Sequence, residues 1–289
     1  MRIGVVFPQT EIGADAGAVR AYAEHVEGLA FAHLLAYDHV VGADPRIHAG
    51  WNGPYDLHTT FHEPLVMFGY LAGVTTLELV TGIIIAPQRQ TVLLAKQAAE
   101  VDLLAQGRFR LGLGIGWNRV EYEALGEDFR TRGRRLDEQI VLLRRLWTEE
   151  SVTFDGRFDH VKGAGLAPLP VQRPIPLWLG AQSPVAYRRV GRVADGWFPQ
   201  ISPGPDLHVA LQEIADGAAD AGRDPAAIAM DGRVTWRGDE AQLAERLTQW
   251  RQYGATHVSV NTMGADLHSV DEHLSALATV AAVAKTVAS

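Results

Sequence analysis

The chain has 289 residues and a formal net charge of -8, from 34 acidic and 26 basic side chains. Hydrophobic residues make up 47% and charged residues 21% of it, values that are typical of a globular protein and exclude a disordered or fibrous chain. The acidic balance disfavours a protein that binds nucleic acid through a basic surface. There is no cysteine, which excludes disulfides, thiolate catalysis and cysteine-ligated zinc.

The sequence shows no targeting or membrane-spanning pattern. The apolar run at Ile3–Phe7 is too short for the hydrophobic region of a signal peptide. The longest apolar stretch, near Leu79–Pro87, is interrupted by Thr81 and Gly82 and is far shorter than the ~20 residues that a transmembrane helix needs. We therefore expect a soluble, cytoplasmic protein that does not bind a membrane.

Strand-like runs alternate with helical patterns along the chain. The strand-like runs are Ile3–Phe7, His33–Tyr37, Leu77–Ile85, Phe109–Leu113, Pro176–Leu179, Gly196–Pro199, Ile228–Trp236 and His257–Asn261. Helical periodicity falls at 16–30, Thr91–Leu104, Leu136–Trp147, Pro184–Val193, Leu207–Ala221, Glu240–Tyr253 and Val270–Val283. This alternation predicts a parallel sheet, and eight such units predict a (β/α)8 TIM barrel, a single domain over residues 1–289. An open doubly wound sheet is the alternative.

Two stretches, at 40–64 and 149–175, are too long for ordinary barrel connections. Both are rich in glycine, proline, histidine and aromatic residues. Long insertions of this kind build a pocket more often than a second domain, so we expect both at the C-terminal rim of the barrel.

A glycine run, Gly112, Gly114 and Gly116, follows a strand and ends at Trp117. Its spacing lacks the third glycine of the dinucleotide fingerprint, and no acidic residue ends a second strand about 20 residues later. Two interpretations remain. The glycines allow two backbones to pack closely, or they let bare backbone approach a flat or anionic ligand at the rim.

The segment Gly180, Ala181, Gln182 and Ser183 leads from a strand into a helix that opens with Pro184. The free N–H groups and the dipole of that helix make it a candidate anion site, with the Ser183 hydroxyl as a further donor. Simple N-capping by Ser183 is the alternative. We favour a bound phosphate.

Asp38 and His39 lie where the second strand ends, at the rim where barrel enzymes place their catalytic groups. His39 is the candidate acid–base residue because an imidazole exchanges protons near neutral pH. A structural, hydrogen-bonded histidine is the alternative interpretation.

His58 and His62 are four residues apart, but the H-E-x-x-H pattern of zinc proteases is absent. Pro54 and Pro64 flank the segment, which disfavours a continuous helix that presents both imidazoles. We expect no metal site.

Further motifs occur in a recognisable order. They are Phe7-Pro8, Tyr37-Asp38-His39, Thr81-Gly82-Ile83, Pro87-Gln88-Arg89, Lys96-Gln97, Gly107-Arg108-Phe109, Gly112–Trp117, Glu121–Gly126, Leu146-Trp147, Gly180–Ser183 and Asp195-Gly196-Trp197. This order resembles that of the bacterial-luciferase-like oxidoreductases, which use flavin or deazaflavin, and in particular their branch dependent on coenzyme F420. The resemblance covers residues 1 to about 200, whereas the last third matches only in its alternation of strands and helices.

The resemblance implies that F420, or alternatively FMN, lies across the C-terminal mouth of the barrel. His39 would lie near the reactive part of the ring, and Gly82-Ile83 matches a segment where relatives carry a non-prolyl cis peptide that supports the ring. Gly114, Gly116 and Trp117 would border the side chain and phosphate. The full predicted cofactor set is Asp38, His39, Thr81, Gly82, Ile83, Gly114, Gly116, Trp117, Gly180, Ala181, Gln182 and Ser183.

The function so implied is hydride transfer between F420 and a small organic substrate, with His39 as proton donor or acceptor. One alternative is an FMN-dependent monooxygenase that uses O2 and reduced flavin from a partner reductase. A second is a barrel that binds flavin without catalysis. Relatives commonly dimerise through helices that follow early strands, so we also expect a homodimer.

We expect the insertion at 40–64 to wall the substrate pocket. Its length and composition suggest this role, and the side chains concerned are Trp51, Tyr55, His58, Phe61 and His62.

Overall fold

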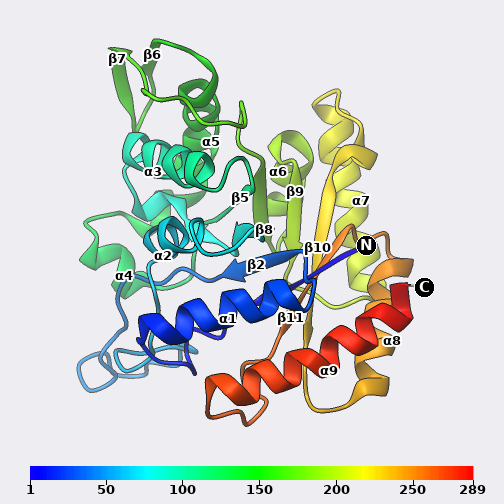
Figure 1. Cartoon of the computed structure of the whole chain (residues 1–289). Helices are drawn as coiled ribbons and strands as arrows, with labels where there is room; N and C mark the ends of the chain where they lie inside the picture. The colour runs from blue at the N-terminus through cyan, green and yellow to red at the C-terminus, as the bar shows by residue number, and fades with distance from the viewer. Residues whose placement is uncertain (289) are drawn as a thin grey trace.

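The computed structural model of the protein describes residues 1–288 and contains a closed ring of parallel strands (Figure 1). The ring consists of β1 (Arg2–Val6), β2 (His33–Ala36), β3 (Glu78–Thr81) with its continuation β4 (Ile84–Ile85), β5 (Phe109–Gly114), β8 (Leu177–Ala181), β9 (Gly196–Pro199), β10 (Ala229–Thr235) and β11 (His257–Asn261). Pairing of β1 with β11 and of β3 with β5 closes the ring. This closure confirms the predicted (β/α)8 barrel and excludes the open sheet.

Helices connect the strands and surround the barrel. They are α1 (Ala16–Gly28), α2 (Pro64–Leu71), α3 (Thr91–Leu104), α4 (Arg119–Ala124), α5 (Arg132–Thr148), α6 (Pro184–Val193), α7 (Pro205–Asp220), α8 (Glu240–Gln252) and α9 (Val270–Ala288). The predicted helical segments agree with these bounds to within a few residues, whereas α2 and α4 were not predicted. No helix in residues 1–288 is long and apolar enough to cross a lipid bilayer.

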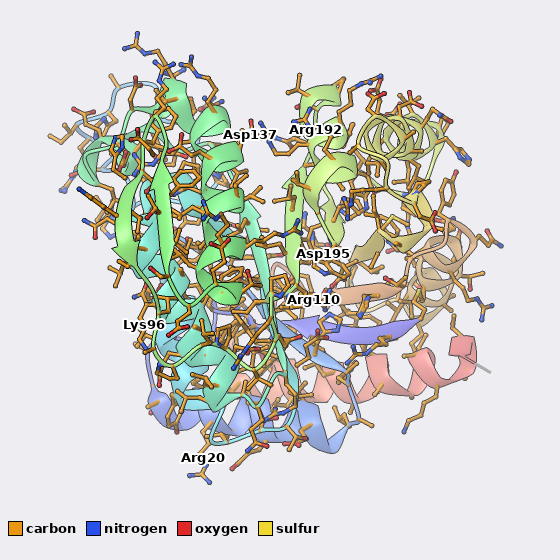
Figure 2. The ribbon with its side chains drawn as sticks, turned by 90° about the horizontal axis from the view of Figure 1, so that it is seen from above. Arg20, Lys96, Arg110, Asp137, Arg192 and Asp195 are labelled. Carbon is orange, nitrogen blue, oxygen red and sulfur yellow. The ribbon has the colours of Figure 1, made fainter. Side chains whose placement is uncertain are left out.

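Local sequence explains how the helices begin and which face they bury. In α1, the Asp15 side chain accepts a hydrogen bond from the Gly17 N–H, and Val19, Tyr22 and Val26 form the buried stripe. Neighbouring helices are also tied by ion pairs. Asp137 of α5 lies 3.9 Å from Arg192 of α6, and the two side chains face each other in Figure 2.

The barrel interior near the N-terminal ends of the strands holds a buried polar cluster, which we call the lower cluster. Arg110 lies near the centre of the molecule (Figure 2) and makes ion pairs of 3.2 Å with both Glu78 and Asp231. Asp231 also accepts a hydrogen bond of 3.0 Å from the Ser259 hydroxyl and lies 3.3 Å from His33 Nε2. Burial alone would raise the pKa of Asp231, but His33 and Arg110 lower it to about 2, so its carboxylate stays ionised.

The two insertions take different courses. The first leaves β2 at its C-terminal end and lies at the lower left of Figure 1, beside the barrel mouth. The second follows α5 and forms a hairpin, β6 (Val152–Asp155) and β7 (His160–Ala164), which stands beyond α3 and α5 at the top of Figure 1.

The hairpin is held against the outside of the helix layer. Glu138 of α5 accepts hydrogen bonds from the N–H groups of Arg157, Phe158 and Asp159 at the hairpin turn. Thr91, the first residue of α3, donates to Asp159 at 2.8 Å. The sequence predicted this insertion at the mouth. The hairpin instead starts where α5 ends, on the opposite side of the barrel, and runs back along the outside of the helices until its turn reaches the first residue of α3.

Candidate active site

The floor of the barrel mouth is an apolar surface that includes Ile83. The peptide bond between Gly82 and Ile83 is cis, at the position that the resemblance indicated. Ile83 packs with the cluster of side chains inside the barrel, and the members of that cluster are Val6, Leu35, Val80, Trp178 and Phe198. An apolar floor of this kind suits the face of a flat aromatic ligand.

Glycines make room for this floor. A Cβ on Gly114 would lie 2.5 Å from Cδ1 of Ile83, and a Cβ on Gly112 would lie 2.0 Å from the Thr81 carbonyl oxygen. A Cβ on Gly180 would contact Ile83 at 3.5 Å, which places the end of β8 against the same floor. Close packing therefore accounts for Gly112 and Gly114, while Gly116 has a φ of 61° that favours glycine.

Two members of the predicted cofactor set bond to the protein itself. The Thr81 hydroxyl bonds both the carbonyl and the N–H of Gly112, and its side chain is fully buried. Asp38 accepts from Arg89 at 2.8 Å and from the Ile85 N–H at 3.0 Å. Burial raises the pKa of Asp38, and the nearby Arg89 guanidinium opposes that rise. The polar atoms of both side chains therefore bond to neighbouring segments of the barrel and stabilise its rim.

His39 lies in an aromatic box at the end of β2. Its ring makes edge contacts with Phe61 at 4.7 Å, Tyr55 at 4.9 Å and Trp117 at 5.6 Å between centroids. Its Nδ1 lies 3.5 Å from Oε2 of Glu121. Because Nδ1 faces Glu121, Nε2 on the other side of the ring is the nitrogen left for a ligand.

Glu121 is a candidate functional residue that was absent from the predicted site. Its side chain is fully buried at the start of α4 and accepts hydrogen bonds from the Val40 N–H at 2.5 Å and from Gln88 at 3.1 Å. Burial alone would raise the pKa of Glu121, but His39, the Val40 N–H and Gln88 together lower it below its ordinary value. The sequence signal was the motif Glu121–Gly126, which follows the glycine run but does not connect Glu121 with His39.

A cavity of about 350 Å³ adjoins His39 and is lined mainly by the first insertion. Its lining includes His39, Tyr55, Leu57, Thr59, Phe61 and Asn118. Trp51 instead packs on Trp117, with centroids 5.7 Å apart, and His62 Nε2 contacts the Gly13 carbonyl at 3.1 Å. Within residues 1–288, no group of three or more histidine or acidic side chains is placed to hold a metal ion.

The start of α6 carries unused hydrogen-bonding capacity. Ser183 has the extended backbone of an N-cap, yet its hydroxyl makes no capping hydrogen bond. Gln182 and Ser183 are exposed, and Gly180 joins this turn to the mouth floor. The hydroxyl capping that the sequence allowed is thus not formed, which leaves the Ser183 hydroxyl available to a ligand.

Comparison with known proteins identifies the family. Residues 1–285 match the luciferase-like monooxygenase family, so the chain belongs to that family of oxidoreductases. The chain is 30% identical over 209 residues to an uncharacterized protein of Mycobacterium tuberculosis, covering 71% of each. It is 31% identical over 234 residues to a phthiodiolone/phenolphthiodiolone dimycocerosates ketoreductase of Mycobacterium kansasii, and 34% identical over 171 residues to an F420-dependent glucose-6-phosphate dehydrogenase of Gordonia bronchialis.

These two enzymes are longer than the matched region. The match covers 73% of this chain and 62% of the ketoreductase, and 56% of this chain and 50% of the dehydrogenase. Among solved structures, a monooxygenase from Streptomyces bottropensis superposes with a TM-score of 0.79 at 20% identity, over the full length of both chains. An F420-dependent secondary alcohol dehydrogenase in complex with an F420-acetone adduct superposes with a TM-score of 0.78 at 16% identity. This match covers 96% of the present chain and 98% of the dehydrogenase chain. At these identities the two structures support the fold.

Proposed function

We propose that this protein is an F420-dependent oxidoreductase that transfers a hydride between the deazaflavin and a small organic substrate, with His39 as the proton donor or acceptor. The observation that carries the proposal is His39 itself, which lies beside a cavity at the barrel mouth with the buried Glu121 behind it. The F420-dependent dehydrogenase among its relatives supports F420 over FMN.

The residues present fit a flat ring that carries a phosphate. The apolar floor at Ile83 would support one face of the ring, and the Ser183 hydroxyl and the N–H groups at the start of α6 would hold the phosphate. Gly116 and Trp117 would border the side chain and phosphate of the cofactor, as the resemblance implies, and Trp117 is 40% exposed. When bound, F420 supplies a two-electron hydride donor or acceptor.

The chain's own groups would then position the substrate and move a proton. The Glu121 carboxylate lies 3.5 Å from Nδ1 of His39 and would hold the ring with Nε2 toward the substrate. Tyr55, Phe61 and Trp117 contact the imidazole on several sides and limit its exposure, which is 11% for the side chain.

An FMN-dependent monooxygenase is the second candidate. It is supported by the family match and by the Streptomyces bottropensis structure, because both are described as monooxygenases. In that case O2 would be the co-substrate and a partner reductase would supply reduced flavin.

Titration with F420 and with FMN, followed by quenching of their fluorescence, tests the proposal. We expect F420 to bind at least about tenfold more tightly than FMN, a difference of about 1.4 kcal/mol. Tighter binding of FMN would favour the monooxygenase, and binding of neither would contradict both functions. Tight F420 binding without any change in its absorbance on addition of alcohols, ketones or enones would favour the non-catalytic barrel.

A further inference from the structure

Arg233 of β10 reaches across the barrel mouth. It lies two residues after the buried Asp231 on the same strand, so both side chains point into the barrel. One guanidinium nitrogen, Nη1, donates to the Tyr37 hydroxyl at 3.2 Å, and Nη2 donates to Oε1 of Gln200 at 3.0 Å. The arginine thus bridges β10 to the ends of β2 and β9 at the open end of the barrel.

Two other arginines of the barrel differ from Arg233 in their partners. Arg89 is paired with both Asp38 and Glu63, and Arg110 is paired with two carboxylates in the lower cluster. Within the described part of the chain, no carboxylate lies within ion-pair distance of Arg233, and its two partners are neutral groups. A guanidinium has five N–H donors, so Arg233 keeps both its charge and free donors for a ligand.

Arg233 also lies beside the mouth floor. A small cavity of about 20 Å³ is lined by Arg233 together with Gly82 and Leu35 of the floor. Asp231 also lines this cavity, but its carboxylate is paired with Arg110, so the charge of Arg233 is not neutralised by it. Burial and the neighbouring Tyr37 raise the pKa of Tyr55, and the positive charge of Arg233 opposes this rise. Tyr55 in turn contacts the His39 ring at 4.9 Å.

We propose that Arg233, flanked by Tyr37 and Gln200, is an oxyanion-binding site of the mouth that takes a planar, negatively charged oxygen group. Two ligands of the proposed function would offer such a group: a substrate that bears a carboxylate, and the reduced cofactor, whose ring would hold negative charge next to a carbonyl. Both match the flat guanidinium fork through charge-assisted hydrogen bonds. The inference rests on the proposed function only in that both ligands bind in this mouth.

The test compares Arg233→Gln with Arg237→Gln in the full-length protein. Arg237 lies at the same rim but donates to the Gly264 carbonyl, so it controls for loss of a rim arginine. Calorimetric titration measures the affinity for oxidised F420 and for chemically reduced F420. With oxidised F420 saturating, the affinities for benzoate and for neutral benzamide are then measured. Circular dichroism of each variant verifies the fold.

If the substrate supplies the anion, Arg233→Gln lowers the affinity for benzoate by about tenfold or more and leaves the affinity for benzamide unchanged. If the cofactor supplies the anion, the same variant lowers the affinity for reduced F420, relative to that for oxidised F420, by a similar factor. Unchanged affinity for both anions in a folded variant, or an equal loss in Arg237→Gln, would overturn the oxyanion site. Failure of the wild type to bind F420 at all would instead overturn the proposed function.

Discussion

Polar groups at the two ends of the barrel interior differ in their hydrogen-bond partners. Those of the lower cluster bond mainly to one another, whereas those at the mouth keep bonding capacity for a ligand. In the lower cluster, Asp231 is satisfied by Arg110, Ser259 and His33, and the Arg110 guanidinium stacks 4.2 Å from the centre of the Trp178 ring. At the mouth, the polar groups keep bonding capacity. Nε2 of His39, the free donors of Arg233 and the Ser183 hydroxyl all remain available to a ligand.

We infer from this difference which groups stabilise the fold and which are candidates for binding a ligand. A buried polar group whose partners are all protein atoms contributes to stability, and its loss leaves the partners unsatisfied. A polar group with free capacity in a lined cavity contributes little to folding and is a candidate for binding or catalysis. Mutations in the two halves should therefore affect different measurements.

The largest effect is expected for His39→Ala. Loss of the proton donor should lower the turnover rate by about 100-fold or more, while F420 affinity and the melting temperature stay close to wild type. Steady-state kinetics, fluorescence titration and thermal unfolding measure the three quantities. Phe61→Leu, which changes the same aromatic box but keeps the imidazole, is the matched control. Full turnover by His39→Ala with bound cofactor would contradict its acid–base role.

Asp231→Asn tests the lower cluster. Removing this carboxylate leaves Arg110 and His33 without their shared partner, so we expect a loss of about 3–5 kcal/mol in the free energy of unfolding. Urea denaturation measures the loss, and Asp155→Asn, at a carboxylate that is 93% exposed, should show little change. If the Asp231→Asn protein were as stable as wild type but bound the cofactor less tightly, the structural role assigned to the lower cluster would be contradicted.

Two serines at helix starts provide a matched pair. The Ser269 hydroxyl accepts from the Glu272 N–H at 3.2 Å, whereas that of Ser183 makes no capping bond. Ser269→Ala should therefore cost about 1 kcal/mol of stability. Ser183→Ala should leave stability unchanged and weaken F420 binding by about three- to tenfold, the value of one hydrogen bond. Equal losses of stability in both variants would show that Ser183 is an ordinary cap.

A smaller, pH-dependent effect is expected from His257, beside the lower cluster. Burial and the positive charge of Arg110 lower the pKa of His257 to about 3, so the folded protein does not bind the proton that the unfolded chain takes up below about pH 6.5. The free energy of unfolding should therefore fall as the pH falls from about 6.5 toward 3. The slope stays below about 1.4 kcal/mol per pH unit, because the ring is partly exposed.

His257→Asn should flatten this slope by up to one proton, as measured by urea denaturation between pH 7 and pH 4. The exposed His25→Asn controls for the removal of an imidazole. An identical slope in wild type and His257→Asn would refute the assignment.

The sequence predicted the barrel well because its signals are local. Buried strands appear as short apolar runs, and the helices between them repeat apolar residues at helical spacing, as Val19, Tyr22 and Val26 do in α1. The path of the second insertion was not predictable, because it depends on Glu138 meeting the hairpin turn in space.

The candidate site could be predicted in part for the same reason. His39 and Ser183 lie next to strand and helix ends, which the sequence marks. Glu121 and Arg233 acquire their significance from residues far away in the chain, His39 and Tyr37 respectively, and no local pattern indicates either pair. Asp38 and Thr81 lie at the mouth as expected. However, the side chain of Asp38 bonds to Arg89 and that of Thr81 bonds to Gly112, so both are engaged within the protein.

Hydrogen–deuterium exchange with and without F420 tests the central claim most directly, because it locates the ligand without depending on turnover. We predict slower exchange at the mouth, in peptides covering 37–42, 81–86, 114–118 and 181–187, and no change in the hairpin at 152–164. Protection confined to the hairpin or the outer helices, or no protection at saturating F420, would contradict the account.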